Sequence, residues 1–135
     1  MIALTAGCIG DSEDSEPEVS AVTRLNRLSV ANHHHEPLAV AVEVEWDGEV
    51  VHTSEHELDS YREEDDSILI DRVEVARDWP TEPGSWTVSI RPADADWNSI
   101  SSEQATTDCT EISGDVKFDG ESFYISWWEN LDATC

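Results

Sequence analysis

The sequence predicts an all-β fold, an antiparallel β-sandwich of seven or eight strands. Three observations lead to this expectation. Apolar and polar residues alternate along most of the chain, turn residues recur about every 8 to 12 positions, and no segment has helical spacing. The 135 residues are enough for one small domain behind an N-terminal extension, and we assign that domain to residues 21–135.

The first half of the domain contains two long alternating segments and a hairpin. Residues 22–32 predict a strand, and after the break at Pro37 the clean alternation over residues 38–46 predicts a second. Asp47-Gly48 is typical of a type I′ turn, so the return strand is expected to start at once and to run to about Leu58.

The second half is less regular. Residues 60–66 are expected to form a polar loop, and residues 68–75 a strand with a bulge near Asp71. A Pro-Gly turn leads into an alternating strand over residues 86–90, whereas residues 94–108 carry too weak a pattern to assign. The last hairpin turns at Asp119-Gly120. Its inward-facing side chains are expected to be Ile112, Val116, Phe118, Phe123, Ile125 and Trp127.

The charge balance is strongly acidic. The chain has 31 Asp and Glu against 7 Lys and Arg, a formal net charge of −24, and Lys117 is its one lysine. Six Trp and the alternating runs favour a folded domain with an acidic surface over a disordered chain. Molar salt screens such a surface, since the Debye length then falls to about 3 Å or less. A basic patch for phosphates is missing, which excludes nucleic-acid binding.

The N-terminus contains a candidate lipidation site. In Leu4-Thr5-Ala6-Gly7-Cys8, small residues precede a Cys that is followed by an acidic segment, and this order matches the box at which lipoprotein precursors are cleaved and lipidated. Residues 1–8 are therefore interpreted as the remnant of a lipoprotein signal. Residues 9–20 are expected to be an acidic, disordered tether. Together they place the domain on the extracytoplasmic face of the cell membrane, anchored by a lipid on Cys8.

Cysteine parity agrees with this interpretation. Lipidation of Cys8 would leave Cys109 and Cys135 as a pair, and a disulfide between them would close a loop of about 26 residues worth about 3 to 4 kcal/mol. The alternative is two free thiols in a reducing compartment.

The order of these features resembles a known kind of protein. The stretch from Trp79 to Ile90, with its prolines, Gly84 and Trp86, resembles the start of a late strand in many immunoglobulin-like domains. With the box at Cys8 and the lysine-poor acidic composition, the chain resembles small haloarchaeal lipoproteins with an immunoglobulin-like domain. The resemblance implies a fold and a location, and it implies no particular activity.

Four histidines are candidate metal ligands. His33 and His35 would point the same way in an extended segment, and His52 and His56 would share the face of their strand that also holds Val50 and Leu58. Imidazole suits Cu and Zn. The alternative is a solvated turn at residues 32–37 without a metal.

The adjacent Trp127 and Trp128 must point to opposite sides of a strand, so at least one leaves the core. An outward Trp at a sheet edge can mark a surface for a protein or a glycan. The sequence contains no Gly-x-Ser-x-Gly nucleophile elbow, and we expect no enzymatic activity. The leading hypothesis is a lipid-anchored binding or accessory module of a halophile cell surface. The alternative is a surface lipoprotein that handles Cu or Zn through the cluster from His33 to His35.

Overall fold

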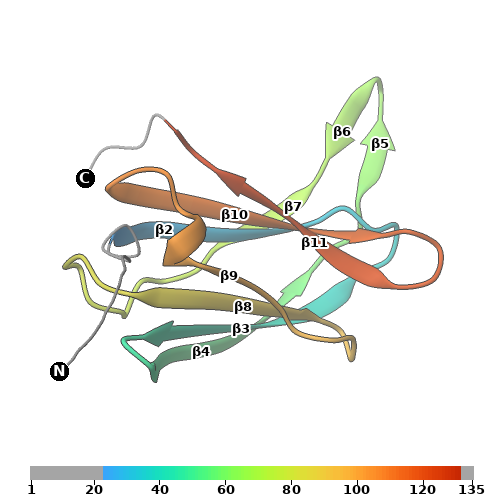
Figure 1. Cartoon of the computed structure of the whole chain (residues 1–135). Helices are drawn as coiled ribbons and strands as arrows, with labels where there is room; N and C mark the ends of the chain where they lie inside the picture. Colours follow the sequence, from blue (N-terminus) through green and yellow to red (C-terminus); the bar gives the residue numbers. More distant parts are fainter. Residues whose placement is uncertain (1–22, 132–135) are drawn as a thin grey trace, which may run out of the picture.

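The computed structural model describes residues 23–131, which form two four-stranded sheets and a separate hairpin (Figure 1). One sheet has the strand order β11-β10-β2-β7 and the other β4-β3-β8-β9. The first sheet contains β2 (Arg24–Asn32), β7 (Asp71–Glu74), β10 (Cys109–Phe118) and β11 (Phe123–Glu129). The second contains β3 (Leu38–Trp46), β4 (Glu49–Leu58), β8 (Trp86–Pro92) and β9 (Asn98–Ser101). The hairpin consists of β5 (Arg62–Glu64) and β6 (Ser67–Leu69), and η2 (Ser102–Gln104) is one 3₁₀ turn.

The core lies between the two sheets, which gives the all-β, sandwich-like fold that the alternation predicts. Leu28 and Val30 of β2 and Val42 of β3 are each at most 1% exposed, and they belong to one buried cluster with Val88 and Ile90 of β8. Alternate residues of each strand therefore face the other sheet, as period two requires.

The turn between β3 and β4 is confirmed. Asp47 has φ 51° and Gly48 has φ 89°, and a type I′ turn needs a positive φ at both of its central residues. The return strand then departs from the prediction at one point. The pairing register shifts at Val44/Glu45, which leaves Val50 53% exposed instead of facing inward with Leu58.

The described residues contain ten strands instead of seven or eight, because two weakly patterned segments are ordered. Residues 60–66 are not a simple loop, since β5 and β6 pair across Asp65 and Asp66, both with positive φ. Asp tolerates this conformation better than most residues, so an acidic run can be a tight turn. Figure 1 shows the hairpin projecting away from both sheets.

The predicted strand over residues 68–75 is two elements. Ile68 lies in β6, 59% exposed on the hairpin, and the chain then enters β7 at Asp71 and pairs with β2. The slip in alternation near Asp71 thus marks a passage between sheets, where a bulge was expected. Residues 94–108 similarly contain β9, an edge strand that pairs only with β8 among the described strands. The hydroxyl of Ser99 in β9 lies 2.7 Å from the hydroxyl of Ser89 in β8.

One strand pair contradicts the expectation of a purely antiparallel sandwich. β2 and β10 are parallel neighbours, with Leu28 opposite Ile112 and Val30 opposite Gly114. A parallel pair needs a long connection. The chain supplies it by visiting the second sheet twice between these two strands.

Several predictions fall outside the described part of the chain. The signal remnant with Cys8, the tether at residues 9–20 and Cys135 all lie there, so the lipidation, the tether and the disulfide stay predictions. Cys109 begins β10 and is 7% exposed. Over residues 23–131 no helix has the length and hydropathy that a membrane span needs.

Candidate functional site

Polar side chains on the inner side of β4 form a hydrogen-bonded chain. The Nε2 atoms of His52 and His56 each lie 2.9 Å from Oγ of Ser54, and Nδ1 of His52 lies 2.5 Å from Oδ1 of Asp78. His52 is 7% exposed, and its ring packs edge-on against Trp79 at 5.5 Å. The prediction that His52 and His56 share a face is confirmed.

With both imidazoles neutral and Asp78 ionised, the following arrangement of protons satisfies every contact in this chain. His52 donates its Nδ1 proton to Asp78, the Ser54 hydroxyl donates to Nε2 of His52, and His56 donates its Nε2 proton to Oγ of Ser54. A carboxylate, an imidazole and a hydroxyl in this order also activate serine nucleophiles. However, five hollows of about 280 to 460 Å³ in the described part of the chain are lined by other side chains, so this serine is not shown to face a substrate.

His33 and His35 do not point the same way. Nε2 of His33 lies 3.4 Å from a carboxylate oxygen of Asp115, whereas the ring of His35 packs edge-on against Tyr61 at 5.3 Å. The segment bends at residues 34–36 instead of staying extended, which separates the two rings. The expectation of a shared direction is therefore wrong.

The four candidate metal ligands thus do not come together at one place. In residues 23–131 no group of three or more His, Cys, Asp or Glu side chains is arranged to hold a metal ion. Of the predicted ligands, His52 and His56 alone converge, and they do so on a hydroxyl. A Cu or Zn site stays a prediction, and of the four predicted ligands only His52 and His56 are placed where they could share one metal ion.

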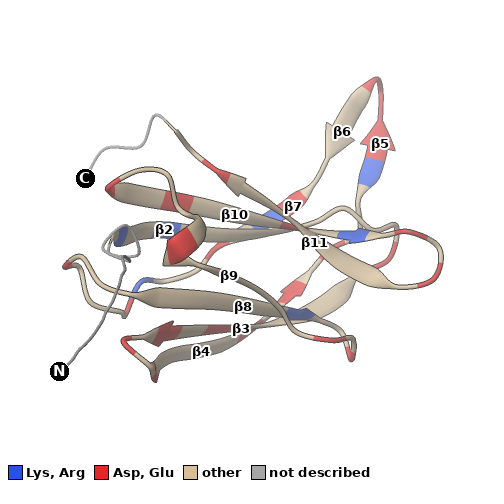
Figure 2. Cartoon of the chain, in the orientation of Figure 1, with Lys and Arg blue, Asp and Glu red and all other residues tan. Residues whose placement is uncertain are grey.

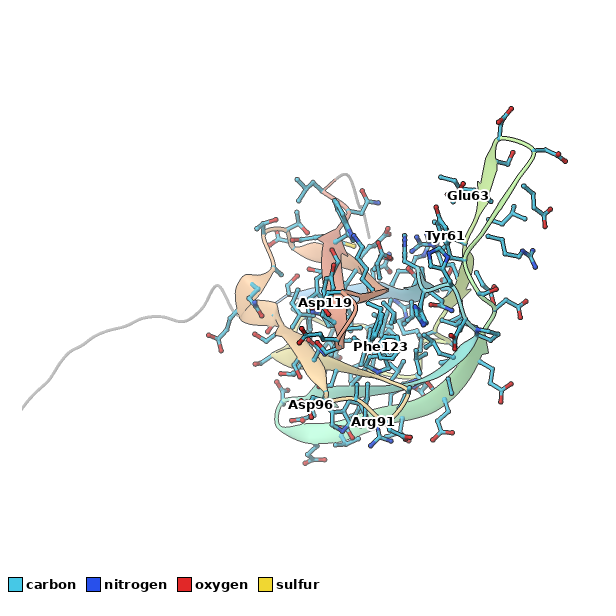
Figure 3. All side chains as sticks on the ribbon, turned by 90° about the vertical axis from the view of Figure 1, so that its right-hand side faces the viewer. Tyr61, Glu63, Arg91, Asp96, Asp119 and Phe123 are labelled. Atoms are coloured by element: carbon cyan, nitrogen blue, oxygen red, sulfur yellow. The ribbon has the colours of Figure 1, made fainter. Side chains whose placement is uncertain are left out.

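A hollow of about 460 Å³ lies where the loop between β8 and β9 meets the turn between β10 and β11. We call it the end hollow. Its aromatic lining is Trp97, Phe118 and Phe123, and its charged lining is Asp96 and Glu121. Figure 3 views the molecule from this end. Its size falls within the range of small-molecule sites, about 300 to 1,000 Å³.

Two of the three aromatic side chains that line the end hollow are exposed, although the sequence predicts Phe118 in the core. Trp97 is 45% exposed and Phe118 is 41% exposed. This end of the hairpin extends beyond the two packed sheets (Figure 1), so the second sheet does not cover the last inward position of β10. The Phe118 and Phe123 rings instead pack on each other at 4.9 Å, and both contact the ring of His34.

The turn beside the end hollow is closed by hydrogen bonds and negatively charged. Backbone N–H groups of Ser122 and Glu121 each donate to Oδ1 of Asp119 at 2.9 Å. These two hydrogen bonds, the one from Ser122 first, lower the pKa of Asp119 below its ordinary value of 3.8. The Asp119 side chain therefore stays ionised and holds the turn that carries Phe118 and Phe123.

The adjacent tryptophans of β11 behave as the sequence predicts. Trp127 packs partly buried against the core, and Trp128 is 58% exposed on the opposite side of the strand. Trp128 lines a shallow hollow of about 280 Å³ with Ile112, Glu111 and Arg27. It is one ring without an aromatic neighbour across the hollow, so we rank this surface behind the end hollow.

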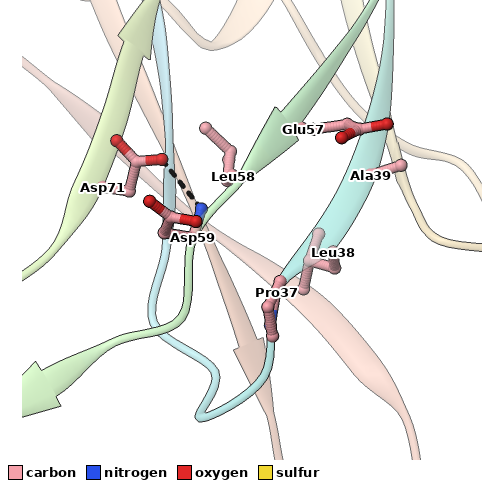
Figure 4. Close-up of a pocket in the computed structure, with 7 residues that line it drawn as sticks. All are labelled: Pro37, Leu38, Ala39, Glu57, Leu58, Asp59 and Asp71. Atoms are coloured by element: carbon pink, nitrogen blue, oxygen red, sulfur yellow. Dashed lines mark hydrogen bonds between the residues drawn. The ribbon is translucent and has the colours of Figure 1, made fainter.

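A third hollow, of about 410 Å³, lies at the start of β3 and the end of β4 (Figure 4). Glu57, Asp59 and Asp71 contribute carboxylates to it, and Oδ2 of Asp71 accepts a hydrogen bond from the backbone N–H of Asp59 at 2.8 Å. Acidic residues also lie in turns and strands elsewhere (Figure 2). The carboxylates here are therefore not distinctive, and we assign this hollow no ligand.

Comparison with known proteins adds no family. No protein-family model matches the chain, and no curated protein resembles it in sequence. The fold and the surface define the class, which is a small all-β, sandwich-like domain with an acidic exterior and an aromatic hollow at one end.

Proposed function

We propose that the protein is a lipid-anchored binding module of the extracytoplasmic cell surface and that it holds its ligand in the end hollow. The observation that carries the proposal is that two exposed aromatic side chains, Trp97 and Phe118, and the partly buried Phe123 line one hollow. Large aromatic side chains normally gain most by burial, so a group of them left open on a folded domain favours a binding surface.

The finer features of the proposal rest on the sequence together with the fold. Two packed four-stranded sheets support an immunoglobulin-like sandwich in the broad sense. The net charge of −24 supports a halophilic setting, and acidic residues lie along loops and strands alike (Figure 2). The proposal assigns the protein no catalytic role.

Binding at the end hollow can be tested with tryptophan fluorescence. We expect at least one class of ligand among neutral sugars, short peptides and small organic cations to change the emission saturably. Phe118→Ala should abolish the change, because it removes a wall of the hollow and leaves the reporter Trp97 in place. Trp128→Ala is the control, since Trp128 is exposed elsewhere and is not among the lining residues. Binding that survives Phe118→Ala, or no binding in any class, would contradict the assignment.

The location can be tested by intact-mass analysis of the protein extracted from native membranes. We expect a mature chain that begins at Cys8 and carries a lipid, with a further loss of two hydrogens from a Cys109–Cys135 disulfide. A soluble chain that begins at Met1 and keeps three free thiols would overturn the location. This measurement reports on the anchor independently of the end hollow.

A further inference from the structure

Two imidazole nitrogens converge on one point on the inner side of β4. The Nε2 atoms of His52 and His56 each lie 2.9 Å from Oγ of Ser54. The three residues alternate along the strand, so their side chains share one face and the two rings flank the hydroxyl. Imidazole nitrogens bind first-row metal ions, and two of them that meet at one point are placed to share an ion.

A carboxylate orients one of these rings in the way that a metal ligand is oriented. Nδ1 of His52 lies 2.5 Å from Oδ1 of Asp78, so its proton points to the carboxylate and Nε2 presents a lone pair toward Ser54. The Trp79 ring packs edge-on against the same imidazole at 5.5 Å. Metal-binding histidines almost always donate the other ring N–H to a carboxylate, a carbonyl or a water, and this contact fixes the ring and makes the ligand nitrogen more basic. His52 therefore already has the supporting contact of a metal ligand.

A metal ion would take the place of the hydroxyl between the rings. An imidazole nitrogen lies about 2 Å from a bound ion such as Zn²⁺, so each Nε2 has to come about 0.9 Å closer to the shared point than its present 2.9 Å. The Ser54 hydroxyl turns away, and the proton of the His56 ring moves from Nε2 to Nδ1. Each ring keeps one proton, so binding to the neutral imidazoles releases none.

The edge of the sheet gives an ion access to this pair. β4 is the outermost strand of its sheet, and no described strand pairs with its free side. Ser54 and His56 are partly buried, whereas His52 is 7% exposed. An ion therefore reaches the nitrogens from the side of His56. The charge of Asp78 favours any cation, so the number of available ligands has to decide which ion is bound.

Two nitrogens are few for most metal ions. In residues 23–131 no third His, Cys, Asp or Glu is arranged to join such a site. Zn²⁺ in proteins takes three or four protein ligands, and Cu(II) prefers a square-planar set of nitrogen and oxygen atoms. Cu(I) has a filled d shell and is stable with two nitrogen donors in line. Two imidazoles that flank one point supply that set.

We infer that His52 and His56 bind one Cu(I) ion and that Asp78 is a positioning residue for the site. The Ser54 hydroxyl bridges the two rings in the absence of the ion. The inference goes beyond the proposed function, because neither histidine lines the end hollow.

The test is a titration of Cu(I) into the full chain without oxygen, in competition with a coloured Cu(I) chelator. Thiols are first blocked with N-ethylmaleimide, because thiolates also bind Cu(I). We expect one ion per chain and no displacement by an equal concentration of Zn²⁺. His52→Gln and His56→Gln should each abolish the binding. His35→Gln is the matched control and should leave it unchanged, since the exposed His35 ring packs against Tyr61 elsewhere.

Two further variants separate a metal site from a purely structural hydrogen-bonded chain. Asp78→Asn keeps an acceptor for the His52 N–H and removes its charge, so the affinity for Cu(I) should fall about 10- to 100-fold. Ser54→Ala removes the bridging hydroxyl and no metal ligand, so it should lower the thermal stability of the metal-free chain and keep the Cu(I) binding.

Thermal unfolding checks that each variant is folded, and the partly buried His56 keeps the test decisive if His52→Gln does not fold. Absence of stoichiometric Cu(I) binding in the unmodified chain would overturn the inference. Binding that survives His56→Gln, binding lost in a folded Ser54→Ala variant, or equal affinity for Zn²⁺ would overturn it as well. None of these results bears on the end hollow.

Discussion

Trp79→Ala is expected to lower the free energy of unfolding by about 3 to 5 kcal/mol. The Trp79 side chain is 4% exposed and lies in the segment between β7 and β8. It packs against the ring of His52, and its Nε1 donates a hydrogen bond to the backbone carbonyl of Leu25 at 2.7 Å. Trp79 therefore connects β2 of one sheet to β4, an edge strand of the other sheet. Its removal leaves a cavity and leaves the carbonyl of Leu25 without this hydrogen bond.

Trp79→Phe separates these two contributions. It keeps most of the ring and removes the N–H, so the expected loss is the smaller cost of leaving one buried carbonyl unpaired, about 1 to 3 kcal/mol. The measurement is urea unfolding followed by far-ultraviolet circular dichroism, at a salt concentration at which the unmodified protein is folded. Trp128→Ala, at an exposed position, should stay within about 0.5 kcal/mol of the unmodified protein. A loss at Trp79 no larger than at Trp128 would contradict the anchoring role.

Gly84→Ala is expected to destabilise the fold by about 1 to 3 kcal/mol or more, although it adds a single methyl group. A Cβ at Gly84 would lie 2.4 to 2.6 Å from three atoms of the Trp46 indole. That ring is 7% exposed and cannot bend. The backbone of Gly84 cannot retreat either, because it exchanges two hydrogen bonds with Thr23, at 3.0 and 3.2 Å.

Gly114→Ala is the matched control in the same unfolding experiment. A Cβ there would lie 2.6 Å from Cδ1 of Ile90, which is the far end of a flexible side chain, and 3.2 Å from atoms of Ile125 and Trp127, whereas at Gly84 all three close atoms belong to one rigid ring. We expect a smaller loss at Gly114 than at Gly84. The reverse order would show that the contact between Gly84 and Trp46 is looser than the structure has it.

Alternation predicted the strands that face the core and failed for those that do not. The period of two in β2, β3 and β8 arises because one face of each strand is buried, so the sequence records the burial directly. β5, β6 and β9 bury little, and their residues are acidic, polar or exposed. No alternation is required of such strands, which is why residues 60–66 were expected to form a loop and residues 94–108 could not be assigned.

The candidate site was predicted only in its parts. Phe123 and the turn at Asp119 were recognised as a hairpin, but Phe118 was expected in the core and Trp97 lay in an unassigned segment. An available signal was the length of the alternating segment, because β10 continues past Val116, the last residue of that strand in the buried cluster. The meeting of the two loops around one hollow could not be predicted, since about 20 residues separate them in the sequence.

The sequence by itself determined the all-β class, the I′ turn at Asp47-Gly48 and the common face of His52 and His56, because each depends on neighbours along the chain. Tertiary structure alone decided the rest. It placed β10 parallel to β2, separated His33 from His35, and left Phe118 open beside Trp97. These outcomes depend on which distant segments pack together, and the free energy of such packing belongs to pairs of residues that no local pattern contains.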